Sequence, residues 1–350
     1  MTKFLVLKAP PVGLGSLMVT TICGKLYAEL TGRIPIVLWR QNCLYHESID
    51  SAETIDNAFE YFFEPSSDYT IADLIGKQYS YYPACWNDQN ILDDTLMQQD
   101  EQAHFRLPIE VDCPGSDADV LVVTEYPGIT SYLPGLMTAY PRFQGLSELE
   151  MLSRYFYNQI HLNSRIQHLI ADFKQQHLKA QINVGLRIRR TDFAALKATP
   201  SDSKYVNAVN TYTAKLDKSY QIFLATDCAR TLKKFRQIYG DRLVYTDCIR
   251  SENASAIHLS RGNNRIKGEQ MLLDLYVLAS CDYFIGSDSN WFWLITRILN
   301  EPLTSQDKVL YLSATRLQKL QKAVSVSSTT LLKTMYRRSK MATKELLNLA

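Results

Sequence analysis

Short apolar runs alternate with helical patterns along most of the chain. In the first half, the apolar runs 4–7, 35–39 and 119–126 predict strands, and residues 16–30 predict a helix after the first of them. The second half contains four more strand-like runs separated by helical or polar segments: INVGLRIR, YQIFLAT, RLVYTD and CDYFIG. This alternation predicts an α/β fold.

The stretch between the two halves predicts a helical connection. Residues 147–177 read as one long helix or as two abutting helices, and Ser147 and Glu150 have the spacing of a capping box at its start. Residues 61–105, by contrast, show no sustained period. We therefore expect a domain boundary between about 165 and 180, with one α/β unit on each side.

Composition sets the outer limits on function. A chain of 350 residues has room for two cores, and a formal net charge of +2 gives no argument for nucleic acid as a partner. The seven cysteines are scattered without a C-x-x-C pair, which favours reduced thiols over a disulfide framework or a zinc site. No apolar run is long enough for a membrane span, and the N-terminus resembles a strand rather than a signal peptide, so we expect a cytoplasmic enzyme.

The stretch VGLRIRRTDF carries the strongest chemical signal. Alternation along a strand places Arg187 and Arg189 on one face, and Arg190 follows as the strand ends. Guanidinium groups crowded at a strand end repel one another unless an anion lies among them, and their planar donors suit phosphate. Ligands of open α/β sheets also bind beyond the carboxyl ends of strands. The alternative is that these arginines pair with carboxylates such as Asp192 or Asp227.

Two further segments are candidates for nucleotide binding. Residues 281–299 read as a strand, a tight turn and a helix start, which is either a phosphate site or an ordinary capped helix. Upstream, Asp274 lies among leucines in a helical pattern, and a buried carboxylate needs a partner. Guanine offers two donors, N1–H and the N2 amine, and an arginine would serve equally well.

Weaker signals have simpler alternatives. Gly13 and Gly15 after the first strand indicate close backbone approach at a crevice, although the dinucleotide fingerprint is incomplete. Asp117 and Asp119 form a D-x-D pattern that fits a solvated turn better than a metal site, and we expect no metal.

Two longer stretches also allow two interpretations. The aromatic stretch 79–86 fits core packing better than a sugar-stacking floor. A basic amphipathic segment at 331–344 could meet a membrane surface, but a face packed on the body is the commoner case.

The motifs together resemble the α-1,6-fucosyltransferases and, in the N-terminal half, the bacterial nodulation protein Z. VGLRIRRTDF resembles the family's first block, IFLATDCARTLKKFRQIYG its strand ending in A-T-D, and LLDLYVLASCDYFIGSDSNWF its third block. TGRIPIVLWRQNCLY and DNAFEYFFEP are similar to the N-terminal half of protein Z. The resemblance spans about residues 3–298 and implies a GT-B architecture, two Rossmann-like domains facing across a cleft.

The resemblance also implies domain roles. Residues 1–170 would form the acceptor-side domain, residues 180–305 the nucleotide-sugar domain, and residues 306–350 a helical segment packing back on the body. The implied activity is a bacterial, inverting, metal-independent transfer of fucose from GDP-fucose, without a cofactor, to a hydroxyl of a glycan, lipo-oligosaccharide or protein.

Carried over position by position, the resemblance implies a donor site. Arg189 would bind the β-phosphate as the catalytic residue, with Arg190 in support and Arg187 where the family has a histidine that contacts the nucleotide. The remaining donor-site residues would be Asp227, Asp274, Ser289, Asn290, Gly13 and Gly15.

Two departures from the family pattern keep other functions open. Arg187 replaces the family's histidine, and Phe193 and Lys197 stand where vertebrate-type enzymes have a lysine and a catalytic glutamate. The chain could therefore use another sugar nucleotide, or it could be an inactive relative that binds nucleotide or glycan.

Overall fold

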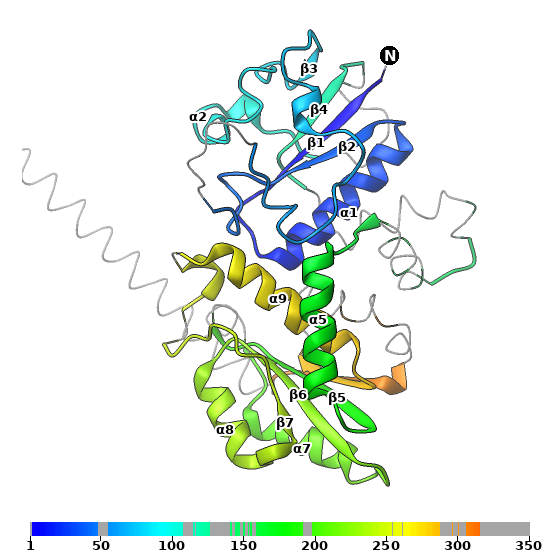
Figure 1. The fold of residues 1–350 in the computed structure, drawn as a ribbon, viewed down its shortest axis with the longest axis vertical. Coiled ribbons are helices and arrows are strands. Elements are labelled where there is room, and N and C mark those ends of the chain that lie inside the picture. The colour runs from blue at the N-terminus through cyan, green and yellow to red at the C-terminus, as the bar shows by residue number, and fades with distance from the viewer. Residues whose placement is uncertain are drawn as a thin grey trace, which may run out of the picture.

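Two parallel sheets, one from each half of the chain, make up the computed structural model of the protein (Figure 1). The structure describes residues 2–315 apart from 48–54, 108–114, 116, 127–140, 142–143, 148–149, 151–152, 154, 156–158, 192–197, 254, 261, 288–295, 297–299 and 301–305. The predicted α/β class is confirmed, because helices cover parallel strands in both halves.

The first sheet has the strand order β2-β1-β4-β3, with every neighbouring pair parallel. Its strands are β1 (Phe4–Lys8), β2 (Ile34–Leu38), β3 (Tyr81–Tyr82) and β4 (Val120–Val123). The long helix α1 (Leu14–Leu30) connects β1 to β2, and the stretch around β3 holds only short elements, η1 (Ile71–Asp73), α2 (Leu96–Gln99) and η2 (Glu101–Ala103). The irregular sequence pattern of 61–105 corresponds to this stretch.

The second sheet has the order β7-β6-β5-β8-β9, again all parallel. Its strands are β5 (Ile182–Ile188), β6 (Tyr220–Thr226), β7 (Leu243–Val244), β8 (Tyr283–Ser287) and β9 (Val309–Leu312). Its helices are α5 (Ser164–His177), α7 (Asp202–Thr213), α8 (Ala229–Tyr239) and α9 (Asn264–Ala279). This order is the 3-2-1-4-5 order of a Rossmann fold without its sixth strand, and the ligand crevice of such a sheet lies at the carboxyl ends of the strands where the order reverses, here between β5 and β8.

Two expectations about the chain differ from the structure. The described residues after 306 are not helical throughout. The short 3₁₀ helix η7 (Gln306–Lys308) is followed by β9, whose backbone hydrogen bonds to β8 stabilise an extended conformation. Of the two alternatives for 147–177, a single long helix is wrong, because Leu162 pairs with Phe63 and the Asn163 side chain accepts a hydrogen bond from the Ile166 amide, which starts α5. The residue ranges of the three domains stay a prediction, and 316–350 lie outside the described residues.

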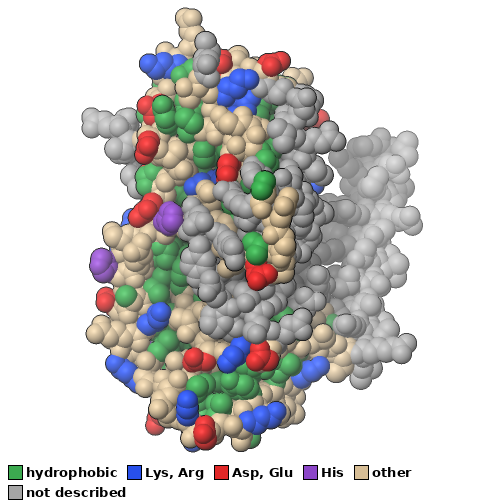
Figure 2. All heavy atoms as spheres, turned by 90° about the vertical axis from the view of Figure 1, so that its right-hand side faces the viewer, with side chains coloured by type: hydrophobic (Ala, Val, Ile, Leu, Met, Phe, Trp, Pro, Cys, Tyr) green, Lys and Arg blue, Asp and Glu red, His purple; other side chains and the backbone are tan. Residues whose placement is uncertain are grey.

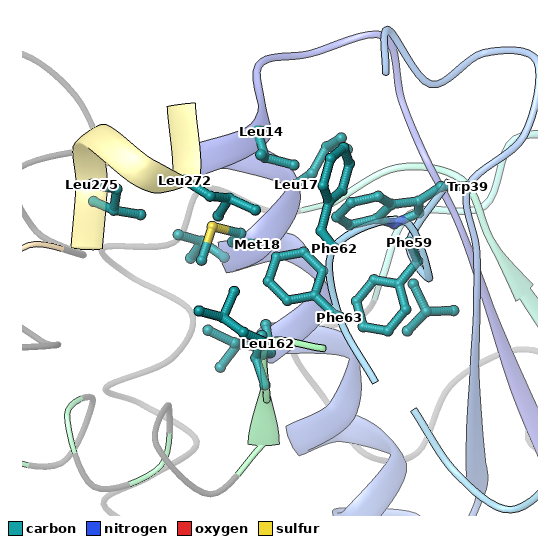
Figure 3. Close-up of a cluster of buried hydrophobic side chains, with 14 of the residues drawn as sticks. Leu14, Leu17, Met18, Trp39, Phe59, Phe62, Phe63, Leu162, Leu272 and Leu275 are labelled. Atoms are coloured by element: carbon teal, nitrogen blue, oxygen red, sulfur yellow. The ribbon is translucent and has the colours of Figure 1, made fainter. Parts of the chain in front are cut away.

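One continuous core joins the two sheets. Alternate residues of β1 face opposite sides, so Leu5 and Leu7 belong to this core while Phe4 and Val6 pack into a second core on the other face of the sheet. The helices α5 and α9 lie between the sheets (Figure 1). Figure 3 shows Leu272 of α9 close to side chains of α1 within the same buried cluster.

Gly268 of α9 lies at a tightly packed contact between the two halves. A Cβ atom at this position would lie 2.3 Å from Cζ of Phe62, whose ring is fully buried. We expect Gly268→Ala to lower the free energy of unfolding by about 1–3 kcal/mol, because overpacking a buried ring outweighs the usual gain in helix propensity. Urea unfolding measures this, with Gly13→Ala as the control because nothing lies within 4 Å of a Cβ there. An unchanged or raised stability of Gly268→Ala would contradict this packing.

On the face shown in Figure 2, the described residues carry charged side chains of both signs. Lysine, arginine, aspartate and glutamate side chains lie interspersed over this face, consistent with the net charge of +2. Within the described part of the chain, none of the helices combines the length and apolar character that crossing a membrane requires.

Candidate functional site

A cavity of about 200 Å³ lies between the two halves, at the carboxyl ends of β5 and β6. The first half contributes the start of α1, with Gly13 and Gly15, and also Tyr45. The second half contributes the end of β5 and one face of α9. The cavity therefore occupies the position in which open α/β sheets bind ligands.

Arg187 and Arg189 both line this cavity, as strand alternation predicts. Leu186 precedes Arg187 and Ile188 lies between the two arginines, and both apolar side chains point into the core on the other face of the sheet. Burial lowers the pKa of Arg187, while the nearby carboxylates of Asp227 and Asp274 oppose this shift. Its Nη1 also donates to the carbonyl of Ala225 at 3.2 Å. The two guanidinium groups thus face the cavity in a partly buried setting where they act strongly on an anion.

Arg190 does not line the cavity, which corrects its predicted place in the donor pocket. Its Nη2 donates to Oδ1 of Asp202 at 2.7 Å, and its guanidinium lies 5.5 Å from the ring centre of Tyr205. The physical reason is the same alternation, which places residue 190 on the face of Leu186 and Ile188. For this arginine, pairing with an internal carboxylate is the correct interpretation.

Asp227 lies at the cavity wall and holds the end of β5 in place. Its carboxylate accepts hydrogen bonds from the backbone amide of Arg190 at 2.8 Å and from the hydroxyl of Thr191 at 2.7 Å. Two hydrogen bonds to one carboxylate fix the loop that follows Arg189. Asp227 therefore positions this loop in addition to lining the cavity.

Asp274 of α9 is a buried carboxylate in the same cavity, only 7% exposed. Its Oδ1 accepts a hydrogen bond from Oγ1 of Thr246 at 2.6 Å. Burial raises the pKa of Asp274, while the Thr246 hydrogen bond and the charge of Arg187 oppose the shift. The carboxylate is thus held in one orientation near positive charges. A fixed orientation is what a carboxylate needs in order to accept hydrogen bonds from a particular ligand.

The N-terminus of α1 forms the opposite wall. Gly13 precedes the first turn, that turn carries no acidic residue, and the amide of Leu14 donates to Oη of Tyr45 at 3.0 Å. Burial raises the pKa of Tyr45 to about 12, while the charge of Arg189 opposes it. Tyr45 therefore stays a neutral phenol close to Arg189. The positive end of this 17-residue helix faces the cavity and favours an anion there.

The predicted helix start after β8 cannot be placed. Ser289 and Asn290 lie outside the described residues, as do Asp192, Phe193 and Lys197. Among the described residues, no group of three or more His, Cys, Asp or Glu side chains could hold a metal ion. Asp119 of the D-x-D pattern accepts hydrogen bonds from the amide and hydroxyl of Ser80. Trp86 of the aromatic stretch is buried in the core, as expected.

Several lining residues were not predicted from the sequence. They include Tyr45, Cys248, Lys267 and Gln270. A signal for Lys267 was present, because it precedes Asp274 by seven residues and so shares its helix face. Tyr45 and Cys248 lie in loops without regular spacing, and only the packing of the two halves brings them to the site.

Comparison with known proteins gives structural matches only. No family model and no curated protein sequence matches the chain. The chain is similar to the NodZ α-1,6-fucosyltransferase soaked with GDP-fucose, with a TM-score of 0.55 and 19% identity over 86% of this chain and 93% of that one. It is also similar to a mutant of FUT1 from Arabidopsis thaliana in complex with GDP, with a TM-score of 0.53 and 12% identity over 91% of this chain and 72% of that one.

A third match has the same character. POFUT1 in complex with GDP has a TM-score of 0.50 and 12% identity, over 89% of this chain and 99% of that one. At such identities the likeness is one of architecture, and it agrees with the two all-parallel sheets and the cavity between them. The chain therefore has the GT-B fold of these fucosyltransferases.

Proposed function

We propose that the protein is a glycosyltransferase that transfers fucose from GDP-fucose to a hydroxyl of a carbohydrate or glycoconjugate acceptor. The observation that carries this proposal is the cavity itself, in which Arg189 and the start of α1 face each other beside the buried carboxylate of Asp274. A nucleoside diphosphate needs positive charge for its phosphates and an acceptor of hydrogen bonds for a guanine base. Among the solved proteins of this fold, FUT1 and POFUT1 are in complex with GDP and NodZ was soaked with GDP-fucose.

The proposed reaction uses the arginine and the helix terminus as electrostatic catalysts. The bond between C1 of fucose and the β-phosphate oxygen breaks, and GDP leaves with the bonding electrons. Arg189 and the positive end of α1 stabilise the charge that grows on the leaving diphosphate, without a metal ion or a cofactor. The acceptor oxygen bonds C1 from the opposite face, with inversion, and its proton passes to a base or to water. Ser289 and Asn290 stay candidates for the phosphate site.

The proposed base site consists of Asp274 and Thr246. The Thr246 hydrogen bond occupies Oδ1 and orients the carboxylate toward N1–H and the N2 amine of guanine. Only the ionised carboxylate accepts both bonds. Because burial raises its pKa, Asp274 takes up a proton at a higher pH than an exposed aspartate does.

The affinity for GDP is therefore expected to fall as the pH is lowered, beginning above the ordinary carboxyl pKa of about 3.9. Isothermal titration calorimetry from pH 8 to pH 5 measures this dependence, and Asp274→Asn should weaken binding and flatten the profile. ADP, which lacks the donor pair, serves as the control ligand. A GDP affinity of Asp274→Asn equal to that of the wild type at all pH values would contradict the assignment.

Arg187 favours a second candidate, the same fold with another sugar nucleotide. It lines the cavity beside Asp274, where the resembling family has a histidine, and its fixed charge changes what the base pocket accepts. A third candidate is an inactive relative, because Lys197 replaces the family's catalytic glutamate.

Thermal-shift assays with GDP, UDP, ADP and NAD separate these candidates. A ligand at 100 times its Kd adds about 2.7 kcal/mol of stability. Stabilisation by GDP together with turnover of GDP-fucose supports the proposal. Stabilisation by UDP alone overturns the assignment of GDP-fucose as the donor. GDP binding without transfer or hydrolysis of GDP-fucose identifies an inactive relative.

A further inference from the structure

Lys267 is the least expected charge in the cavity. The residue is only 5% exposed, and it lines the cavity from α9. Its Nζ donates to the carbonyl of Ser260 at 2.6 Å and lies 3.5 Å from the hydroxyl of the same residue. Both of these oxygens are neutral. Burial is the cause of its lowered pKa, without an opposing carboxylate among the described residues.

The position of Lys267 relative to Asp274 follows from the helix. Residues 267, 270, 271 and 274 all line the cavity, and their spacing defines one face of α9. A separation of seven residues places Lys267 about 10 Å along the helix from Asp274. Gly268, pressed against Phe62, prevents α9 from turning this face away. A ligand whose base lies at Asp274 can therefore extend along α9 toward Lys267.

The energetics favour a charged ligand at this position. A buried ammonium group costs free energy unless an opposite charge or several hydrogen bonds compensate for its lost hydration. Two oxygens of Ser260 compensate only in part, since an ammonium group has three donors and a full charge. An anionic ligand group in the cavity would supply the missing charge, and a hydrogen bond of this kind is stronger than one between neutral groups.

We propose that Lys267 is a substrate-binding residue whose ammonium group contacts an anionic group, phosphate or carboxylate, of a substrate held in the cavity. The proposal rests on the proposed function, because it takes the cavity to be the donor site. The anionic group belongs either to the diphosphate of the donor or to an acidic sugar of the acceptor. A purely structural Lys267 would instead tie Ser260 and the turn η5 (Ile257–Leu259) to α9 and would not discriminate between ligands.

The test compares Lys267→Met with Lys267→Arg and with Lys233→Met, an exposed lysine of α8 that provides the same change in charge. Calorimetry measures the affinities for GDP and guanosine, and then for glucuronate in the presence of saturating GDP. Circular dichroism and urea unfolding establish that each variant is folded, and Lys267→Gln replaces Lys267→Met if the latter is not.

We expect Lys267→Met to weaken GDP binding about tenfold or more, while guanosine binding stays unchanged and Lys267→Arg retains most of the affinity. This result assigns the contact to the donor diphosphate. Unchanged GDP binding with a loss of glucuronate binding assigns it to the acceptor.

Two outcomes overturn the role of Lys267. One is that GDP and guanosine binding weaken by the same factor, and the other is that all affinities equal those of Lys233→Met. Either outcome leaves the proposed function standing as long as the wild-type protein binds GDP. A wild-type protein that does not bind GDP removes the proposed function itself.

Discussion

Arg189→Ala lowers kcat/KM for GDP-fucose by about 10²–10³-fold, the loss expected when a donor that stabilises a developing oxyanion is removed. Arg189 lines the cavity beside Tyr45 and faces the positive end of α1, so its charge acts where the proposed diphosphate leaves. The partly buried site strengthens this interaction over its value in water. Steady-state kinetics of GDP-fucose transfer or hydrolysis measure the effect. Calorimetry with GDP measures how much of the loss is already present in ground-state binding of the nucleotide.

Two other arginines give this prediction its controls. Arg236→Ala removes an exposed guanidinium of α8, and we expect its kinetics to match the wild type. Arg190→Ala should lower the free energy of unfolding instead of the GDP affinity, because Arg190 pairs with Asp202 away from the cavity. An Arg189→Ala protein that is folded and binds and turns over its donor like the wild type would disprove the assignment of the phosphate site.

Asp94→Ala is expected to destabilise the protein by about 3–5 kcal/mol, the usual cost of leaving one partner of a buried ion pair alone. Nζ of Lys8 lies 2.8 Å from Oδ1 of Asp94, and both side chains are almost fully buried. Lys8 Nζ also donates to the carbonyl of Ile91 at 2.6 Å, and the ammonium lies 4.7 Å from the ring centre of Trp86. Burial lowers the pKa of Lys8, while Asp94 opposes this shift.

Urea unfolding of matched variants separates the charge effect from the loss of side-chain volume. Asp93→Ala, at the exposed neighbouring carboxylate, should change the free energy of unfolding by less than about 1 kcal/mol. The double variant Lys8→Met with Asp94→Leu should recover most of the loss, since an apolar pair of similar size often replaces a buried ion pair without cost. If Asp94→Ala is as stable as Asp93→Ala, the pair does not stabilise the end of β1.

The positions of the arginines in the cavity could largely be predicted from the sequence, because strand alternation is a local property. The period of two in VGLRIRR places Arg187 and Arg189 on the face opposite Leu186, and the structure has this arrangement. The same rule, extended by one residue, turns Arg190 away toward Asp202. Placing Arg190 in the pocket with the other two arginines was wrong, because that prediction considered its charge and not the face of the strand on which it lies.

Asp274 illustrates how a local pattern implies a buried carboxylate but not its partner. The leucines around it predict a buried helix position. Only the folded chain places Thr246 at 2.6 Å and Arg187 near enough to affect its pKa. Those neighbours come from a separate loop and from a strand, and no spacing in the sequence relates them to α9.

The sequence by itself therefore determined the α/β class, most strands, and the shared face of Arg187 and Arg189 at the end of β5, because these depend on periodicity and on residue type within a short window. The tertiary structure decided the place of Tyr45 in the other wall of the cavity, the strand β9 and the place of Lys267. Each of these depends on a contact between distant segments: α1 packs with α9 in one core, β9 pairs with β8, and Phe62 holds α9 at Gly268. Such contacts form only when burial of apolar surface brings the two halves together, and no local pattern encodes which segments will meet.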